Sequence, residues 1–516
     1  MKRRFLLLLL VNVFVVLSAI AVTIDGVRYE INNGSATVCG LSNDYNGNGN
    51  IVIPQYIEYN GKYEVKSIAE RAFESSSITS VTIPNSVTYI GKWAFCDCYR
   101  LSRLILGNSL EGIGFCAFSD CRSLTSVTIP NSVKSIGGYA FEKCESLTSI
   151  IIPNSVTNLE GSTFYQCSSL TSVTLSDNLR SIGTYTFAYC EKLIEIKIPN
   201  SVTSIDSYAF FECKGLNTIS IGIGLISIGE RAFDNCINLS EFKVNSDNPY
   251  FCSVSGILFN KDMTTLIGYP AAKSEQNYFI PNSVLTIGNH AFTNCIGLTS
   301  VIIPHNVTSI EEGAFSSMYN LTHIVFPNSV KRIGKAVFGG CRSLSSVIIE
   351  NGVETIGLGS FQGCTSLTSV SIPNSVTKIG SYAFLGCSGL TTVVIGSGAK
   401  DIYGSAFQNC DNVKDIYFYV ESVPSSCGFE LNIRDIRETA TLHVPAKSID
   451  LYKKAKYWKD FKNIVALTDS DPKPTGVINI KDEIKAEERY YDLHGHHVNK
   501  PSKGIYIVNG KKVLIK

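Results

Sequence analysis

Apolar residues recur along most of this chain with a period of 23 residues. The stretch 124–146 reads LTSVTIPNSVKSIGGYAFEKCES, and the next stretch opens with LTSIIIPNSV at Leu147. A phenylalanine marks the period at Phe95, Phe118, Phe141, Phe164, Phe187, Phe210 and Phe233, and again at Phe292, Phe315, Phe338, Phe361, Phe384 and Phe407. Phe73 lies 22 residues before the first of these, which gives about fourteen copies. So regular a repeat predicts a solenoid in which each coil buries its apolar residues against its neighbours.

Each copy predicts two extended segments and a turn. The interior positions of one copy are Leu124, Val127 and Ile129 in a first strand, Val133 and Ile136 in a second segment, and Ala140, Phe141 and Cys144 in a short helical or 3₁₀ turn. Pro130-Asn131 separates the two segments, because proline fixes φ and lacks an N–H donor. Stacked copies should pair their strands in parallel, at about 4.8 Å per coil.

A glycine follows the second segment in most copies, as at Gly137. Glu160, Asp206, Glu311 and Tyr403 take its place elsewhere. A position that required a positive φ would rarely accept these residues, so we expect glycine only to ease a bend there.

These repeats resemble the BspA-like leucine-rich-repeat family of bacterial surface proteins, whose units have the form LxxIxIPxxVxxIGxxAFxxC. The resemblance covers residues 65–420 and departs from the pattern at few positions, among them Val337 for alanine and Met318 for cysteine. It implies a solenoid and a binding role at the cell surface, with adhesion to host or neighbouring-cell macromolecules.

Two segments interrupt or close the array. Residues 245–276 fall in a 59-residue interval between Phe233 and Phe292, and Asn260-Lys261-Asp262 predicts a hairpin turn there, either a structural elaboration or a recognition feature. Residues 22–66 predict an N-terminal β cap with a hairpin at Asn60-Gly61. The solenoid proper spans 67–420. Residues 421–467 predict the other cap, with a strand at ATLHVP and a helix over 448–460.

The N-terminus has the pattern of a signal peptide over residues 1–21. Lys2, Arg3 and Arg4 precede an apolar run, and Ala19-Ile20-Ala21 offers a small-x-small cleavage site. The run is short for a membrane-spanning helix, and the mature chain contains no other candidate span. Without the leader, 42 basic residues stand against 44 acidic ones, a balance that does not favour nucleic-acid binding. We therefore expect a secreted or outer-surface protein.

The last 41 residues differ from the repeats. A polar linker at 468–475 precedes residues 476–516, which predict three short strands. This segment looks like the C-terminal sorting domain of the type IX secretion system, and the matching residues are Gly504, Ile505, Tyr506, Lys511 and Lys512. The resemblance implies contact with the secretion machinery, and the alternative is a small β appendage without an export role. Three histidines at 494–497 lack a further ligand at fixed spacing, so we expect no metal site.

Seventeen cysteines in an exported chain would ordinarily suggest disulfides. Twelve of them recur at the same repeat position, where side chains in register point the same way rather than at one another. We expect a buried ladder of free thiols, and Met318 in one of these positions fits apolar packing.

No catalytic motif or cofactor fingerprint is present, so the sequence predicts a protein that is not an enzyme and binds no cofactor. The candidate ligand-binding residues share the position two before the repeated phenylalanine: Trp93, Tyr139, Tyr185, Tyr208, Arg231, His290 and Tyr382. Such residues are favoured interface anchors, although they could also only shield the turn. The partner would be an extracellular protein or glycan. Alternative functions are a structural scaffold in the envelope and a carbohydrate-capturing module.

Overall fold

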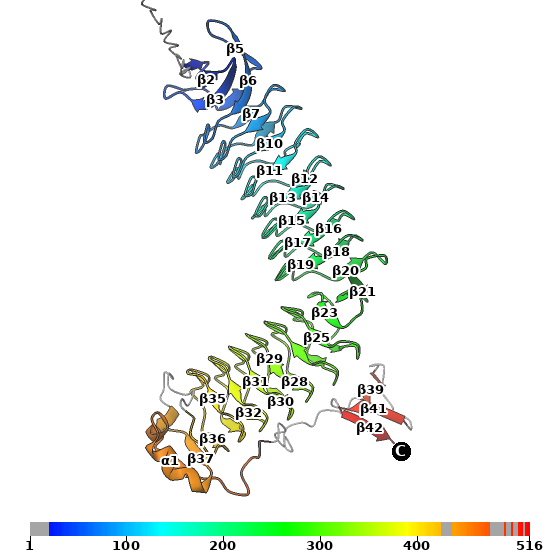
Figure 1. The fold of residues 1–516 in the computed structure, drawn as a ribbon, viewed down its shortest axis with the longest axis vertical. Helices are drawn as coiled ribbons and strands as arrows, with labels where there is room; N and C mark the ends of the chain where they lie inside the picture. The colour runs from blue at the N-terminus through cyan, green and yellow to red at the C-terminus, as the bar shows by residue number, and fades with distance from the viewer. Residues whose placement is uncertain are drawn as a thin grey trace, which may run out of the picture. The chain divides into compact units, whose positions relative to one another are not determined.

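The computed structural model describes residues 20–424 and 436–474, together with four short strands from residue 490 onward. Two compact units form, residues 1–191 and residues 192–516. In each unit the repeats form stacked coils (Figure 1). The predicted signal peptide lies almost entirely outside the described residues, although strand β1 begins at Ile20.

The N-terminal unit opens with a β cap. The cap strands are β1 (Ile20–Ile24), β2 (Val27–Asn32), β3 (Ser35–Leu41), β5 (Tyr56–Glu58) and β6 (Lys62–Ile68). Glu58 pairs with Lys62, so the hairpin predicted at Asn60-Gly61 is confirmed. β6 then pairs in parallel with β8, which joins the cap to the repeats without an exposed sheet edge.

Two parallel ladders follow through this unit. The first contains β4 (Asn50–Val52), β7 (Ser80–Thr82), β9 (Arg103–Ile105), β12 (Ser149–Ile151) and β14 (Ser172–Thr174). The second contains β8 (Tyr89–Ile90), β10 (Gly112–Ile113), β11 (Ser135–Ile136), β13 (Asn158–Leu159) and β15 (Ser181–Ile182). Paired residues such as Gly112 and Ser135 lie 23 positions apart, which confirms the predicted register.

The third side of each coil, which we call the AF turn, is not the predicted helical or 3₁₀ segment. It is a run of turns in which the residue two before the ladder phenylalanine and the residue two after it both have positive φ, 53° at Trp93 and 59° at Asp97. The backbone N–H groups of Trp93, Phe95 and Asp97 donate to the carbonyls of Phe115, Ala117 and Ser119 in the next coil, at 2.8–2.9 Å. A helix would direct these groups along its own axis, so it could not bond to the neighbouring coil.

Phenylalanine rings stack through the interior. In the N-terminal unit Phe73, Phe95 and Phe118 have centroid separations of 5.0 and 5.1 Å and nearly parallel planes. The ladder cysteines lie beside them, buried and free. Each thiol near this stack donates to a phenylalanine carbonyl of the preceding coil, as from Cys121 Sγ to Phe95 O at 3.2 Å. Burial holds the pKa of the Cys121 thiol well above its ordinary value.

The repeat glycine has no positive φ, so the expectation that the position does not demand one is confirmed. A Cβ at Gly91 or Gly114 would nevertheless lie within 2.8 Å of the preceding coil's backbone. Glycine is therefore favoured by close approach between coils, and a larger residue such as Glu160 requires the coils to shift locally.

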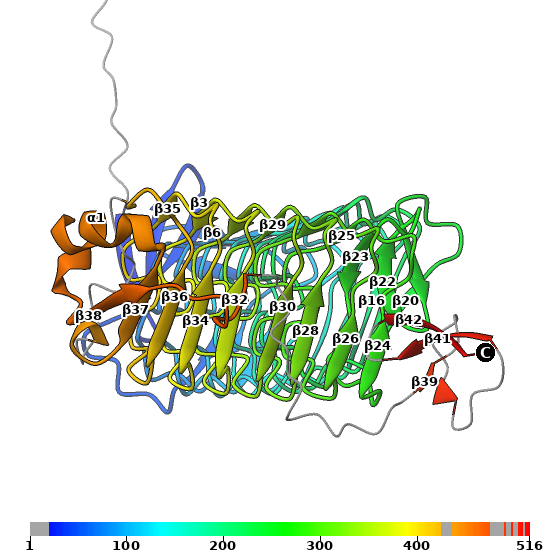
Figure 2. The same cartoon turned by 90° about the horizontal axis from the view of Figure 1, so that it is seen from below.

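The C-terminal unit contains the same two kinds of ladder. The strands before the interruption are β16 (Glu195–Ile198), β17 (Ser204–Ile205), β18 (Thr218–Ile221), β19 (Ser227–Ile228) and β20 (Glu241–Val244). Those after it are β24 (Asn277–Phe279), β25 (Thr286–Ile287), β26 (Ser300–Ile302), β27 (Ser309–Ile310), β28 (His323–Phe326), β29 (Arg332–Ile333), β30 (Ser346–Ile349), β31 (Thr355–Ile356), β32 (Ser369–Ile372), β33 (Lys378–Ile379), β34 (Thr392–Ile395), β35 (Asp401–Ile402) and β36 (Asp415–Phe418). Strands β24 to β36 of the first ladder lie side by side on one face (Figure 2).

The interruption is a three-stranded antiparallel meander rather than a single hairpin. Its strands are β21 (Phe251–Val254), β22 (Ile257–Asn260) and β23 (Thr265–Gly268). The turn predicted at 260–262 does connect β22 to β23. β23 then pairs in parallel with β25, so the meander's last strand begins the second ladder again.

Tyr269 begins the next phenylalanine stack, which the repeat comparison missed. It lies 23 residues before Phe292, and their rings stack at 5.2 Å. Its N–H donates to Ala291 O, and its carbonyl accepts from the Cys295 thiol, as in the other coils. Tyrosine thus replaces phenylalanine in one additional coil.

The C-terminal cap covers the last coil. β37 (Thr441–Val444) and β38 (Asn463–Ala466) extend the first ladder. The helix predicted over 448–460 is instead η2 (Ala446–Ser448), α1 (Ile449–Lys454) and η3 (Trp458–Asp460), interrupted at Tyr457, which has φ of 70°. Beyond the linker, the structure describes β39 (Tyr490–Tyr491), β40 (His497–Val498), β41 (Gly504–Val508) and β42 (Lys511–Ile515) in one antiparallel sheet, one strand more than predicted.

Candidate binding surfaces

All seven candidate ligand-binding residues have the same backbone conformation. Their φ angles lie between 53° and 59°, in the left-handed region. Gly313 and Gly359 occupy the same position in other coils with φ of 61° and 59°. The fold therefore imposes this conformation, and most coils meet it with a residue other than glycine, at a cost of about 1–2 kcal/mol. Because the left-handed residue lies on the AF turn, its side chain belongs to one edge of the coil.

In the N-terminal unit this position builds part of an aromatic surface. Trp93 meets Phe115 edge to face at 5.5 Å, and Phe115 meets Tyr139 in the same way at 5.5 Å. The Arg71 guanidinium lies over the Trp93 ring at 4.5 Å. Phe115 and Tyr139 are 36% and 38% exposed, so this row remains accessible to a partner.

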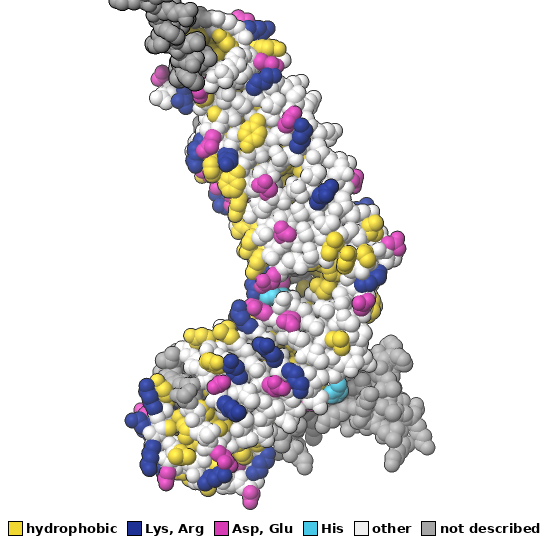
Figure 3. Space-filling view, viewed as in Figure 1, with side chains coloured by type: hydrophobic (Ala, Val, Ile, Leu, Met, Phe, Trp, Pro, Cys, Tyr) yellow, Lys and Arg dark blue, Asp and Glu magenta, His cyan; other side chains and the backbone are white. Residues whose placement is uncertain are grey.

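A second ring cluster lies on the AF turns further along the same unit. Tyr165 contacts Tyr185 at 6.2 Å and Tyr189 at 5.4 Å. We call Trp93, Phe115, Tyr139, Tyr165, Tyr185 and Tyr189 the aromatic face. Figure 3 shows hydrophobic side chains gathered along one edge of the coils. Phe115, Tyr165 and Tyr189 were missed because only one repeat position was searched.

The candidate residues of the C-terminal unit do not form such a row. Tyr382 is 42% exposed and has small residues at the same position in the neighbouring coils, Gly359 and Ser405. Tyr208 contacts Phe211 at 5.6 Å, and the Arg231 guanidinium lies 6.0 Å from its ring. The row of edge-to-face rings at Trp93, Phe115 and Tyr139 therefore belongs to the N-terminal unit.

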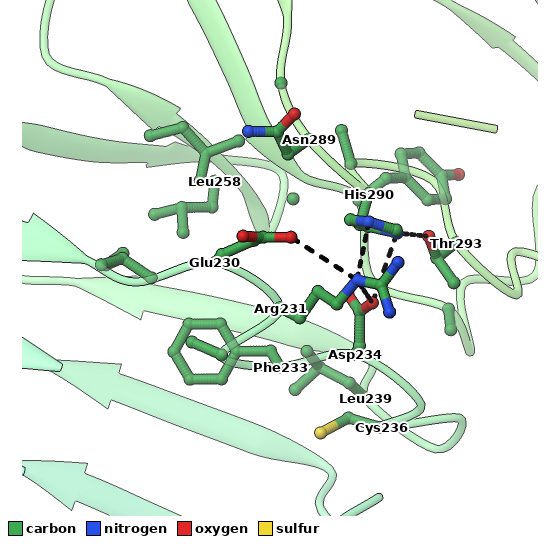
Figure 4. Close-up of a pocket in the computed structure, with 18 of the residues that line it drawn as sticks. Glu230, Arg231, Phe233, Asp234, Cys236, Leu239, Leu258, Asn289, His290 and Thr293 are labelled. Atoms are coloured by element: carbon green, nitrogen blue, oxygen red, sulfur yellow. Dashed lines mark hydrogen bonds and ion pairs between the residues drawn. The ribbon is translucent and has the colours of Figure 1, made fainter. Parts of the chain in front are cut away.

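Arg231 and His290 are brought together instead, across the interruption. Arg231 Nε donates to His290 Nε2 at 2.8 Å, and the Asp234 carboxylate lies 3.4 Å from His290 Nδ1 (Figure 4). His290 Nδ1 also lies 3.3 Å from the Thr293 hydroxyl. Since Nε2 accepts a hydrogen bond, the neutral ring carries its proton on Nδ1 and directs it toward Asp234.

These groups line a cleft of about 270 Å³, which we call the break cleft. Its apolar lining includes Phe233, Phe242, Leu258 and Tyr269. Burial raises the pKa of Asp234 to about 7. Burial, and then the Arg231 charge, lowers the pKa of His290 to about 4. Both shifts favour the neutral forms, as expected in a partly dehydrated site.

Hydroxyl side chains next to the first ladder form a further surface, which we call the hydroxyl lattice, and many of them are bonded between neighbouring coils. Thr148 Oγ1 donates to Thr125 O, and Thr171 Oγ1 donates to Thr148 O at 3.0 Å. Thr391 repeats the contact with Thr368 O at 3.2 Å. These hydroxyl groups use their protons in hydrogen bonds between neighbouring coils, so they can offer a ligand mainly the lone pairs of their oxygens.

The repeats match a known family model. The BspA type Leucine rich repeat region matches residues 66–194, 180–261, 271–364 and 333–444, in six copies. These segments cover most of the chain. The chain belongs to this family.

Solved structures of leucine-rich-repeat proteins agree with the fold. The chain is 30% identical to a leucine rich cell surface protein from Faecalibacterium prausnitzii A2-165, with 78% of this chain and 95% of that chain covered and a TM-score of 0.54. It is 26% identical to a leucine-rich repeat protein from Bacteroides ovatus ATCC 8483, with 87% and 100% covered and a TM-score of 0.56. No curated protein matches the chain.

The remaining predicted sites of this BspA-type chain are less defined. Gly504, Ile505 and Tyr506 lie on β41, and Lys511 and Lys512 begin β42, with Val508 paired to Lys511. Within the described residues, no helix has the length and apolar character needed to cross a membrane. No group of three or more histidine, cysteine or acidic residues is placed to hold a metal in that part of the chain.

Proposed function

We propose that this BspA-type protein is an exported, non-enzymatic binding protein that adheres to host or neighbouring-cell macromolecules through its aromatic face. This proposal rests on the row of mutually contacting rings at Trp93, Phe115 and Tyr139, of which Phe115 and Tyr139 are exposed. The fold requires a left-handed residue at two of these positions, yet the chain places large rings there rather than glycine. Because glycine would meet the same backbone requirement at lower cost, the large rings at these positions support a functional role for the side chains.

The chemistry of the aromatic face supports a protein partner. Rings that contact one another lose little conformational entropy on binding and supply large apolar areas. The hydroxyl lattice is the less suitable surface, because its donors are already used between coils. The similarity to a leucine rich cell surface protein from Faecalibacterium prausnitzii supports the location at the cell surface.

A triple variant tests the aromatic face. Trp93→Ser, Tyr139→Ser and Tyr185→Ser remove three rings, and serine already occupies this left-handed position at Ser162 and Ser405. We expect binding to immobilised extracellular-matrix proteins to weaken at least about tenfold, since each anchor contributes on the order of 1 kcal/mol or more. Tyr382→Ser is the matched control, at the same repeat position outside the face, and should bind like the wild type.

Unchanged binding by the triple variant would remove the aromatic face from the proposal. A chain that binds no extracellular ligand while remaining tightly associated with the envelope would instead be a structural scaffold. A glycan array on which the wild type binds and the triple variant does not would assign the face to carbohydrate.

We also propose that residues 1–21 direct export and that residues 476–516 act as a sorting segment for the type IX machinery. The apolar leader and the β41–β42 pair containing Gly504 to Lys512 support this proposal. Deleting 476–516 should leave the solenoid folded but retain it in the periplasm, as measured by fractionation of the producing cells. Normal surface display of the deletion variant would show that the segment has no sorting role.

A further inference from the structure

The break cleft lies where one AF turn is missing. In an intact coil three backbone N–H groups of the AF turn donate to the next coil, as Tyr208, Phe210 and Glu212 donate to the carbonyls of residues 230, 232 and 234 at 2.8–3.0 Å. The equivalent groups of the following coil belong to Arg231, Phe233 and Asn235. Within the described residues these three N–H groups have no hydrogen-bond partner, because the chain leaves the coil and enters the meander.

The phenylalanine stack is interrupted at the same place. Phe233 stacks on Phe210 at 5.7 Å, but no ring stacks on its other face. Phe242 meets it only edge to face, at 5.5 Å. Phe233 is partly exposed, whereas the other ladder phenylalanines of the described chain are buried. The next stack begins across the cleft at Tyr269, which has no ring contact with Phe233.

Both ladders of strands also stop here. β19 ends a four-stranded sheet and β20 ends a three-stranded one. The meander strand β21 begins the next sheet of the second ladder, and β24 begins the next sheet of the first ladder. Arg231 and His290 bridge the rim, and so do the side chains of Asn235 and Asn294. These two side-chain hydrogen bonds join the two walls of the cleft at its rim.

We propose that the break cleft binds a segment of a partner protein that takes the place of the missing AF turn and carries an aromatic side chain. The backbone N–H groups without a partner and the uncovered face of the Phe233 ring indicate the chemistry of this ligand. The three backbone N–H groups of Arg231, Phe233 and Asn235 lie at alternate residues, so the ligand must offer acceptors at the same spacing. The carbonyl groups of a polypeptide backbone supply such acceptors, as they do when a peptide adds to a sheet edge. The uncovered face of the Phe233 ring favours an aromatic side chain, because other phenylalanines of the stack are covered by the ring of the next coil.

Size and charge favour this ligand over others. A volume of about 270 Å³ is at the lower limit of ligand pockets and suits one aromatic residue with its flanking backbone. The apolar lining of Phe233, Phe242 and Leu258 gives a hydroxyl-rich sugar few partners. The Arg231 cation is already held by His290 and the nearby Asp234 carboxyl, so a simple anion gains little.

The probe is a fluorescein-labelled peptide, Ac-GSYAFLG-NH2, which copies residues 380–386 of an intact AF turn. Titration of the full chain, followed by fluorescence polarisation, should give saturable binding with Kd of about 1 mM or tighter. The peptide Ac-GSYAALG-NH2, without the phenyl ring, should bind at least about tenfold more weakly. Equal binding of the two peptides, or none by the first, would overturn the proposal.

A blocking variant locates the site. A Cβ at Gly268 would lie 3.3 Å from the Phe242 ring inside the cleft, so Gly268→Leu should fill it and abolish binding. Gly404→Leu is the matched control, because a Cβ there meets no atom within 4 Å, and it should bind as the wild type does. Circular dichroism checks that both variants fold. Retained binding by folded Gly268→Leu, or displacement of the peptide by maltohexaose, would show that the proposal is wrong.

Discussion

Many residues of the AF turns adopt a left-handed backbone conformation that residues other than glycine disfavour. The residue two before each ladder phenylalanine is left-handed, whether it is glycine, serine, tyrosine or histidine. The hydrogen bonds between AF turns explain why, since alternating backbone conformations direct successive N–H groups toward the next coil. Side chains at this position are therefore selected for what they contact rather than for backbone preference.

Substitution at Tyr382 separates the backbone cost from the ring. Tyr382 has φ of 59° and is 42% exposed. Tyr382→Gly relieves the left-handed strain, whereas Tyr382→Ala keeps it, so the glycine variant should be more stable by about 1 kcal/mol. Urea denaturation of the two variants measures the difference. Equal stability would mean that the position carries no strain.

The pH should affect the stability of the fold around the break cleft through Asp234 and His290, which act in opposite directions. Burial raises the pKa of Asp234 to about 7, so the stability that its neutral form contributes is lost as the pH rises from about 4 toward 7. Burial lowers the pKa of His290 to about 4, so its contribution is lost as the pH falls from about 6.5 toward 4. The charged groups Glu230, Arg231 and Glu312 also act on this pair.

Single substitutions should expose each trend. In Asp234→Asn only the histidine remains. As the pH is lowered from 6.5 to 4, the unfolding temperature of this variant should decrease relative to that of the wild type. In His290→Gln only the aspartate remains, and the unfolding temperature should increase relative to that of the wild type as the pH is lowered over the same interval. Thermal unfolding at several pH values measures both. Parallel profiles for the wild type and the two variants would contradict these pKa shifts.

At the scale of the elements, the coil is stabilised by stacking on both sides. Phe361 stacks on Phe338 at 5.5 Å and on Phe384 at 5.1 Å and is fully buried. Phe361→Ala should cost about 3–5 kcal/mol, as in other cores. Phe233 stacks on one face and is partly exposed, so Phe233→Ala should cost clearly less. Denaturant midpoints of the two variants compare them, and equal losses would show that the cleft is closed in solution.

Repetition explains which elements could be predicted from the sequence. The 23-residue register alone placed the strands and the stack, because each coil repeats the contacts of its neighbour. It failed at the AF turn, because glycine marks the two left-handed positions in only a few coils, as at Gly313, Gly359 and Gly363. It missed Tyr269 because tyrosine replaces phenylalanine there, although the spacing to Phe292 could have revealed it.

The break cleft could not be predicted from the same pattern. It depends on β23 pairing with β25 after the meander, a contact that repeat spacing does not encode. The aromatic face was only half predicted for a related reason. Phe115 and Tyr165 occupy different repeat positions from Trp93, and the coil geometry brings Phe115 against Trp93 and Tyr165 against Tyr185.

At the scale of the whole molecule, an array of identical coils must close its open ends. The C-terminal cap does so with Trp458, whose ring lies 4.8 Å from that of Phe418, and with Tyr452, whose hydroxyl donates to Val420 O at 2.8 Å. β37 and β38 also cover the edge of β36. An uncovered coil would present both an apolar surface and an unpaired strand edge.

Two truncations of the exported chain follow from this arrangement. Residues 22–467 retain the whole cap and should remain soluble and monomeric, with the unfolding midpoint of the full chain. Residues 22–420 lose Tyr452, Trp458, β37 and β38, so Phe418 and the β36 edge become exposed, and this variant should associate or aggregate. Light scattering after size exclusion distinguishes them. A monomeric 22–420 chain with an unchanged midpoint would mean that the last coil is stable without a cover, because stacking on the preceding coil alone would then be sufficient to hold it.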